Sequence, residues 1–189
     1  RRLAAVNSAP LDYAPANEAE VAPGLFMDRY EHPNRPDSAP TIDVDHATAT
    51  AACAAERKRL CTTVEWERAC AGRADDALPY GPDYVRAACN IEGAEPGLSG
   101  RHLACASEAG VYDLVGNVWE WTATELPLDA LRTRPDERRY EVRGGSWRTD
   151  RRKGVCKPDD GYPAADGQRS FTDVGFRCCR GDASQSAPA

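Results

Sequence analysis

Eight cysteines limit the folds open to this 189-residue chain more than any other feature. They stand at positions 53, 61, 70, 89, 105, 156, 178 and 179. Zinc-binding cysteines come in paired CxxC or CxxH clusters, and the sequence contains none. An even number of widely spaced cysteines is instead typical of a disulfide framework, which forms in an oxidising compartment. We therefore expect an extracellular, cell-surface or periplasmic protein; buried free thiols in a cytosolic protein are the alternative.

The charge balance and the lack of a long apolar run exclude two classes of protein. A transmembrane helix needs roughly 18 consecutive apolar residues, and no stretch of the sequence approaches this length. Proteins that bind nucleic acid usually carry a basic face, whereas this chain has 24 Lys and Arg against 30 Asp and Glu. We expect neither a membrane span nor a nucleic-acid partner.

Two short helices are expected. Residues 44–59 are rich in alanine and end in basic residues, which favours a helix whose C-terminus lies near positive charge. Thr62 and Glu65 form a capping box, which begins a second helix over 64–72. The spacing in this helix predicts a core face and a solvent face, made respectively by Val64, Trp66 and Ala69 and by Glu65, Glu67 and Arg68.

Short strands and long loops account for the rest of the chain. The strand-like segments are 25–31, 111–123, 140–148 and 173–180, and the loops between them are 32–43, 73–110 and 149–170. With 15 Gly and 14 Pro, the composition favours an α+β fold with little regular structure, stapled by disulfides. We expect an extended N-terminal arm or tail over 1–24, a folded domain over 25–181 and a flexible C-terminal tail over 182–189.

Five segments occur in an order that is specific to one family. They are MDRYEHPN (27–34), RLCTTVEWERACAG (59–72), YDLVGNVWEWT (112–122), VRGGSW (142–147) and GFRCCR (175–180). Together they resemble the formylglycine-generating enzyme family, also called sulfatase-modifying factor domains. The resemblance implies a C-type-lectin-like fold, and this family includes many members without the enzyme's activity.

The resemblance also implies two disulfides. The family pairs the cysteine of its first helix with that of the GFRC segment, which here gives Cys53–Cys178. It pairs the cysteine that ends the capped helix with one downstream of the GGS strand, which here gives Cys70–Cys156. For the other four cysteines we favour Cys89–Cys105 and Cys61–Cys179, although the sequence alone leaves their connectivity open.

The family's reaction oxidises a substrate cysteine to formylglycine with O₂ and a Cu(I) ion held by two thiolates, soft ligands that suit this ion. The matching positions in this chain, counted without gaps, are Thr149 and Gly154, neither of which binds copper. A small gap would bring Cys156 to the second position, but the first ligand would still be missing. We therefore expect no copper, and an oxidase with an altered centre at Cys156 remains the alternative.

A second branch of the superfamily uses iron held by histidines and makes sulfur–carbon bonds. The three histidines of this chain, His32, His46 and His102, are far apart in the sequence. They form an iron site only if the fold collects them, so we expect surface or capping roles.

Calcium is the metal that the resemblance favours, with one or two ions. One family site matches the side chains of Asp113 and Glu120 and the carbonyls of Gly116 and Val118, all oxygen donors of the kind that Ca²⁺ prefers. The alternative is that Glu120 accepts a hydrogen bond from the loop backbone. A second site would begin at Asn90 and Ile91, with Glu95 or Glu108 as its acidic partner.

The family's substrate groove lies near the GGS strand. Its counterparts here are Ser146, Trp147, Arg148, Arg143 and, from the neighbouring segment, Trp119. One of Trp119 and Trp121 is expected to face the core and the other outward, since side chains alternate along a strand. Packing in the core and at its rim is the alternative for all of these side chains. We interpret the basic run 148–153 as a solvated loop rather than a phosphate site.

These observations favour a non-catalytic, secreted or surface-exposed binding or assembly module, stabilised by disulfides and calcium. A protein or peptide is the expected partner, and the N-terminal arm is a candidate for docking onto a neighbouring subunit. A glycan-binding lectin-like module is a further alternative, which rests on fold analogy alone.

Overall fold

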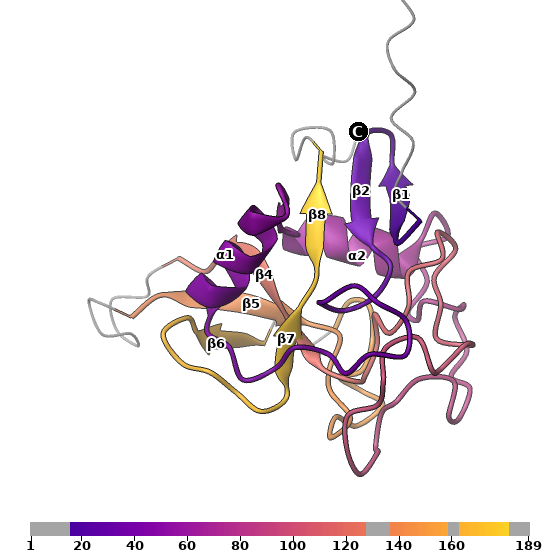
Figure 1. Ribbon diagram of the computed structural model, residues 1–189. Coiled ribbons are helices and arrows are strands. Elements are labelled where there is room, and N and C mark those ends of the chain that lie inside the picture. The colour runs from indigo at the N-terminus through magenta and orange to yellow at the C-terminus, as the bar shows by residue number, and fades with distance from the viewer. Residues whose placement is uncertain (1–15, 128–136, 159–162, 182–189) are drawn as a thin grey trace, which may run out of the picture.

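The computed structural model describes residues 16–127, 137–158 and 163–181, and shows an α+β fold (Figure 1). The expected C-terminal tail, 182–189, lies outside this part. Two small sheets and two helices frame the fold, and long loops occupy one side of it (Figure 1). No helix in the described residues is long and apolar enough to cross a membrane.

The first sheet is assembled from distant parts of the chain. Its strand order is β1-β2-β8-β3 and all neighbours are antiparallel. The strands are β1 (Glu18–Ala22), β2 (Leu25–Asp28), β3 (Arg59–Leu60) and β8 (Cys178–Arg180). Because β8 lies between β2 and β3, the C-terminal part of the domain completes this sheet.

The second sheet has the order β6-β5-β4-β7. Its strands are β4 (Trp119–Glu125), β5 (Arg139–Arg143), β6 (Ala164–Asp166) and β7 (Val174–Phe176). Strands β4 and β7 are parallel, and the other two pairs are antiparallel. The segment 173–180, expected as one strand, is therefore two strands in different sheets, and β6 lies within the region 149–170 that was expected to be loop.

The boundary expected at residue 25 is wrong. Strand β1 lies within the predicted arm and pairs with β2 from Glu18 opposite Asp28 onward. The sequence hid this strand because a carboxylate, Glu18, is buried in it. Lys58 and Arg180 neutralise this carboxylate at 3.3 and 2.5 Å. Residues 1–15, the remainder of the arm, lie outside the described residues.

Helix α1 (His46–Ala55) is shorter than expected. Asp45 caps it by accepting a hydrogen bond of 2.8 Å from the backbone N–H of Thr48. It ends at Ala55, and Arg57 beyond it has a positive φ of 60°. The basic residues therefore follow the helix, and Lys58 instead binds the buried carboxylate of Asp28 at 2.6 Å.

Helix α2 (Thr63–Ala71) confirms the capping box and part of the predicted faces, since Trp66 and Ala69 are buried and Arg68 is exposed. Thr62 and Glu65 cap the helix reciprocally. Val64, expected in the core, is 51% exposed, whereas Glu65 and Glu67 are buried. The two carboxylates are buried because Arg59 binds Glu65 at 2.6 Å and Arg143 binds Glu67 at 3.2 Å. Hydrophobicity alone does not reveal such pairing.

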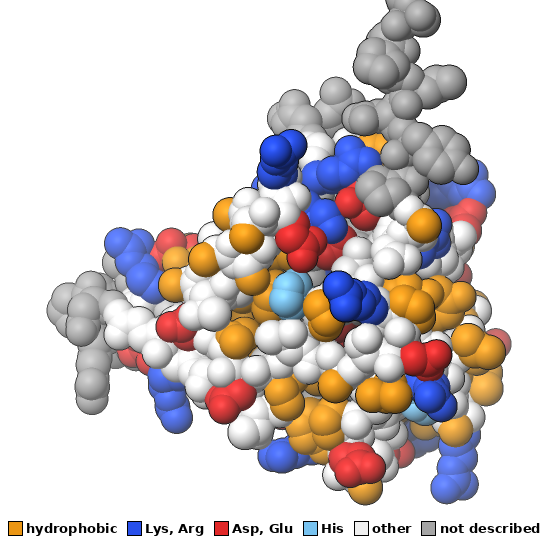
Figure 2. Space-filling model, viewed as in Figure 1, with side chains coloured by type: hydrophobic (Ala, Val, Ile, Leu, Met, Phe, Trp, Pro, Cys, Tyr) orange, Lys and Arg blue, Asp and Glu red, His pale blue; other side chains and the backbone are white. Residues whose placement is uncertain are grey.

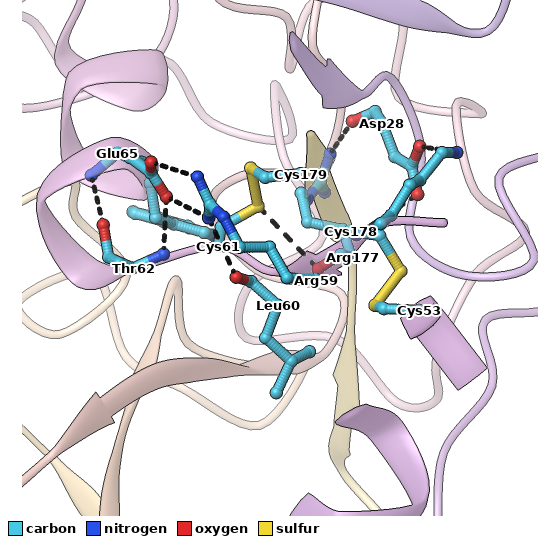
Figure 3. The surroundings of a disulfide bond; sticks show 12 residues. Asp28, Cys53, Arg59, Leu60, Cys61, Thr62, Glu65, Arg177, Cys178 and Cys179 are labelled. Carbon is cyan, nitrogen blue, oxygen red and sulfur yellow. Dashed lines mark hydrogen bonds and ion pairs between the residues drawn. A yellow bond between two sulfur atoms is a disulfide. The ribbon is translucent and has the colours of Figure 1, made fainter. Parts of the chain in front are cut away.

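All four expected disulfides are present. They are Cys53–Cys178, Cys61–Cys179, Cys70–Cys156 and Cys89–Cys105, with Cα–Cα distances of 4.8–5.5 Å. The chain has no free cysteine. Figure 3 shows that adjacent residues of β8, Cys178 and Cys179, carry two of these bridges in opposite directions. One joins β8 to α1 and the other to the segment after β3, so both helical segments are attached to the last strand.

Two apolar clusters form the core. The first surrounds Trp66 of α2 and includes Leu114 and Val115 from the loop before β4. The second surrounds Trp121 of β4 and includes Phe176 of β7. Three of the disulfides belong to the first cluster and Cys53–Cys178 belongs to the second. On the face shown in Figure 2, acidic and basic side chains are interspersed and neither sign dominates.

Candidate functional site

A buried arginine lies where the two sheets meet. Arg177 stands between β7 and β8 and is 1% exposed. Its guanidinium binds both carboxylate oxygens of Glu120 at 2.7 and 2.8 Å, and Trp66 donates to the same carboxylate at 2.7 Å. The remaining donors of Arg177 reach the backbone carbonyls of Asp28, Arg29 and Tyr112. Burial opposes its charge, yet the carboxylate of Glu120 more than offsets this and the pKa of Arg177 is raised.

Two more carboxylates lie close to this ion pair. Burial raises the pKa of Glu31 well above its usual range, and the charges of Asp113 and Glu120 raise it further. Burial also raises the pKa of Asp113 to about 6. Arg177 lowers both pKa values, but one guanidinium does not neutralise three carboxylates. We call this group the acidic cluster; its members are Glu31, Asp113, Glu120 and Arg177. The acidic cluster therefore carries excess negative charge.

The loop before β4 is held to the acidic cluster by hydrogen bonds. Asn117, at the centre of the loop, donates to both oxygens of Glu31 at 2.8 and 3.0 Å, and Ser99 donates to Glu31 as well. The carboxylate of Asp113 accepts from the backbone N–H of Gly100 at 2.5 Å. These contacts position the loop side chains before any ligand binds.

Only glycine fits at position 116. Its φ is 80°, and a Cβ there would collide with the backbone carbonyl of Asn90. The same carbonyl accepts a hydrogen bond of 2.8 Å from the backbone N–H of Asn117. The segment around Asn90 and Ile91 is therefore packed directly against the loop.

The expected calcium donors fit in part. Asp113 is 2% exposed in a region of excess negative charge, which suits a cation. Both oxygens of Glu120 already accept from Arg177 and Trp66, so Glu120 fits a direct ligand role poorly. Within the described residues, no group of three or more His, Cys, Asp or Glu side chains is arranged around one metal position. Backbone carbonyls would have to complete the shell.

Glu108 does not lie at the second expected calcium site, for which it was one of two candidate acidic partners. Glu108 is ion-paired with Arg73 at the surface, on the side of the domain where α2 ends. The side chain of Asn90 donates to the backbone carbonyl of Glu95 at 3.1 Å. Of the two acidic candidates, Glu95 is the one that lies beside Asn90.

The positions that match the family's copper ligands serve structural roles. Thr149 is buried, and its hydroxyl accepts a hydrogen bond of 2.8 Å from the backbone N–H of Ser146. Gly154 has no side chain and is buried close to the side chain of Ile91. Cys156 is fully buried in its bridge to Cys70. None of the three offers a free thiolate.

The three histidines are in separate environments. His32 stacks on Phe176 and contacts the hydroxyl of Thr41 at 2.9 Å. His46, at the start of α1, stacks on Tyr140 and contacts the carbonyl of Thr122. His102 lies beside the carbonyl of Ala87, in the loop region. They do not form a cluster that could hold a metal ion in the described residues.

Most of the expected groove residues lie in the core. Ser146, Trp147 and Arg143 are 0%, 5% and 1% exposed, and Trp119 is half-buried against the second apolar cluster. Of the two tryptophans, Trp121 faces the core, which agrees with the expected alternation of side chains along the strand. Arg148 is exposed, with its guanidinium 4.8 Å from the ring of Trp147. The buried side chains of this set pack the interior rather than line an open groove. Arg143 is held there because it binds buried Glu67 and Glu141.

Open cavities occur elsewhere, at the C-terminal end of α2. Two adjoining cavities of about 600 and 590 Å³ share Gly72, Arg73 and Glu108 in their walls. Sequence reasoning did not find this region. It also missed Glu31 and Arg177, although a charged residue between Phe176 and Cys178 in an otherwise apolar segment is a signal for a buried ion pair.

Comparison with known proteins agrees with this architecture. A model of the family described as sulfatase-modifying factor enzyme 1-like domain matches residues 12–181. The inactive C-alpha-formylglycine-generating enzyme 2 of Bos taurus is 34% identical over 121 residues, which cover 57% of this chain and 38% of that protein. The formylglycine-generating enzyme of Thermomonospora curvata is 31% identical over 144 residues, 66% of this chain and 47% of that protein. The chain thus spans less than half the length of these relatives.

The fold is shared with more distant proteins. Treponema denticola variable protein 1 superposes with a TM-score of 0.64 at 14% identity, over 84% of each chain. This match concerns the fold alone, which is of the C-type-lectin-like kind found in formylglycine-generating enzymes. Since the family model covers nearly all of the described residues, the chain belongs to the sulfatase-modifying factor enzyme 1-like domain family.

Proposed function

We propose that this chain is a non-catalytic member of its family that serves as a binding or assembly module. One observation carries the proposal: the positions that match the two copper ligands hold a buried threonine and a glycine, Thr149 and Gly154. Two thiolates are needed for a two-coordinate Cu(I) site. The nearest cysteine, Cys156, is consumed by its bridge to Cys70.

The disulfides support a role outside a reducing compartment. Four bridges in one domain require an oxidising environment, which favours an extracellular, cell-surface or periplasmic location. They also hold long loops in one conformation, and rigid loops on a scaffold are typical binding elements. A protein or a glycan is the partner that such a surface would take.

Calcium belongs to the same proposal as a structural ion. Asp113 would supply a carboxylate, and Gly116 and Val118 would supply backbone carbonyls. Support comes from the acidic cluster, in which three carboxyl groups share one guanidinium, and from the burial of Asp113, which raises its pKa to about 6. A bound Ca²⁺ would balance this charge and hold the loop before β4. The fit is weaker for Glu120, whose oxygens are taken by Arg177 and Trp66.

A thiol count and an activity assay test the absence of catalysis. The protein is unfolded without reductant, alkylated and weighed intact, and then assayed for oxidation of a cysteine-containing peptide in the presence of Cu(I) and O₂. We expect no alkylation and no aldehyde product. Alkylation at Cys156, or formylglycine formed by the wild-type protein, would refute the proposal. The Thr149→Cys/Gly154→Cys variant serves as a control for copper uptake by a restored thiol pair.

Calcium is tested separately by titrating metal-free protein and following thermal unfolding. At a concentration 100-fold above the dissociation constant, a ligand specific for the folded state stabilises it by about 2.7 kcal/mol. We expect a clear rise in melting temperature with Ca²⁺ and none with an equal ionic strength of NaCl. An unchanged melting temperature would remove calcium from the proposal without affecting the argument about copper.

A further inference from the structure

Four cations stand within six residues, directly after the GGS segment. Arg148, Arg151, Arg152 and Lys153 are all exposed, and Asp150 is the one carboxylate among them. The segment 148–153, here called the basic turn, therefore carries a net charge of +3. Since the whole chain carries −6, the remaining residues carry −9. The basic turn is thus a concentrated positive feature on an otherwise acidic protein.

The basic turn is ordered by its own hydrogen bonds. The backbone carbonyl of Asp150 accepts from the N–H groups of Lys153 and Gly154 at 3.1 and 3.0 Å. The carboxylate of Asp150 accepts from the N–H of Arg152 at 2.9 Å. Asp150 is therefore used to shape the turn, and the cations project from a defined backbone.

Both ends of the basic turn are fixed to the core. Before it, the backbone N–H of Glu92 donates to the carbonyl of Thr149, and Trp147 is buried. After it, Cys156 is bridged to Cys70, and its backbone N–H donates to Ala77 at 2.8 Å. In Figure 1 this segment, light orange after β5, runs beside the long loops of the domain. Little backbone entropy therefore remains to be lost when a ligand binds.

None of the four cations has an ion-pair partner among the described residues, which sets them apart from the structural cations of this domain. Lys58, Arg143 and Arg177 each bind a buried carboxylate. None of the four side chains in the basic turn forms a salt bridge with any described residue. Mutual repulsion within such a group is relieved by an external anion.

We propose that the basic turn binds an anionic polysaccharide, one that carries sulfate or carboxylate groups. Three of the four cations are arginines, whose planar guanidinium binds such groups through two parallel hydrogen bonds. Arg148 is already oriented by its contact with Trp147 at 4.8 Å. This inference rests on the proposed function, because it names the class of partner for a non-catalytic module in an oxidising compartment, where such polymers are found.

The surface favours a polysaccharide over other polyanions. Apart from the buried Thr149, the residues of the basic turn are all exposed and charged, so the turn itself offers no apolar side chain to a peptide partner. The charge of −9 on the remaining residues opposes the close approach of a nucleic-acid duplex, whose charge density is high. A flexible chain with spaced anionic groups can contact the turn alone.

The test is a binding titration with heparin, using dextran as the neutral polysaccharide and poly-glutamate and duplex DNA as other polyanions. The Arg151→Gln/Arg152→Gln/Lys153→Gln variant removes three charges from the basic turn. The matched control, Arg35→Gln/Arg68→Gln/Arg86→Gln, removes three charges from exposed, dispersed residues that also form no salt bridge. Intact mass and circular dichroism verify four disulfides and an unchanged fold in each variant.

We expect heparin to bind the wild-type protein with an affinity that falls as salt is added. The variant in the basic turn should bind about tenfold or more weakly, and the control should bind within about twofold of the wild-type protein. Asp150→Asn keeps the acceptor that shapes the turn and removes its only negative charge, so it should bind more tightly. Lack of heparin binding at low salt, equal losses in both triple variants, or equal affinity for DNA or poly-glutamate would overturn the inference. None of these results would bear on copper or on the thiol count.

Discussion

The two bridges on Cys178 and Cys179 should behave as one unit when they are removed. Each spans a long stretch of chain, 125 and 118 residues. In the loop-entropy model, closing either loop alone stabilises the folded state by about 5 kcal/mol. Once one bridge exists, however, the other closes a ring of only nine residues, eight from Cys53 to Cys61 and one from Cys178 to Cys179. That second closure contributes about 2.5 kcal/mol.

Removal of one bridge should therefore cost about 2.5 kcal/mol, because the neighbouring bridge still closes the long loop. The two variants are Cys53→Ala/Cys178→Ala and Cys61→Ala/Cys179→Ala. Removal of both should cost about 7.5 kcal/mol, which exceeds the sum of the single removals by about 2.5 kcal/mol. Alanine is chosen because all four sulfurs are buried and a serine hydroxyl would lack a partner.

The assay is urea unfolding without reductant, followed by the fluorescence of the buried Trp66 and Trp121. Cys89→Ala/Cys105→Ala is the matched control, because its bridge closes a separate loop of 16 residues. Its removal should cost about 3 kcal/mol and should add to the cost of either adjacent bridge within about 0.5 kcal/mol. If the two adjacent bridges were also additive, the reasoning from loop entropy would be refuted.

Three further predictions concern the buried charges and the helix cap. Arg177→Met should destabilise the protein by about 3–5 kcal/mol in urea unfolding, because it leaves Glu120 buried without its cation. The double variant Arg177→Met/Glu120→Gln should recover part of this loss. A cost below about 1 kcal/mol for Arg177→Met would contradict the assigned role of the pair. The pKa of Asp113 is raised to about 6, so the folded state holds an extra proton between the unfolded value of 3.8 and about 6, and stability should fall as pH rises through that window. In Asp113→Asn, measured without calcium, that part of the pH dependence should vanish, and an unchanged pH profile would disprove the assignment. In a separate titration, Ca²⁺ should raise the melting temperature of this variant less than that of the wild-type protein, because the amide oxygen is an uncharged ligand. Thr62→Ala should cost about 1 kcal/mol through loss of the α2 cap. It is measured by the same urea unfolding, with Thr172→Ala as a control at an exposed threonine outside the helices.

Local signals in the sequence predicted the parts of the fold that depend on short-range chemistry. The capping box of Thr62 and Glu65 places the start of α2 within a residue, because its hydrogen bonds lie within a single turn. The even set of cysteines predicted a disulfide framework, and the resemblance predicted Cys53–Cys178 and Cys70–Cys156. The other two pairings were favoured although the sequence left their connectivity open, and the structure contains both. These features depend on residue type and spacing, which a single sequence contains.

Other features depend on charge pairs between distant segments, which spacing does not reveal. Glu18, Glu65 and Glu67 looked like solvent-facing or arm residues, yet each is buried with a cation from elsewhere in the chain. The boundary at residue 25 failed for this reason. The predicted groove failed similarly, because Arg143 is held inside the domain by Glu67 and Glu141.

The calcium site stays a prediction, and it depends both on local residue types and on contacts between distant segments. The residue types at Asp113, Gly116 and Val118 suit an oxygen-liganded ion, and the structure adds buried negative charge around them. The position of Arg177 in an apolar segment signals a buried ion pair, but it does not identify Glu120 as the partner whose two oxygens Arg177 occupies. The partner of Glu120 is 57 residues away in the sequence, so this pair is visible only after the fold is known.

The place of β8 between β2 and β3 has a consequence for the order of folding. Strand β8 reaches β2 across a separation of about 150 residues, as the contact of Asp28 with Cys178 shows. During synthesis, the ribosome releases β2 and β3 long before their shared neighbour exists. Both strands must remain unpaired on that side until nearly the whole domain has emerged. Such a nascent chain exposes unpaired strand edges, which favour aggregation until β8 pairs with them.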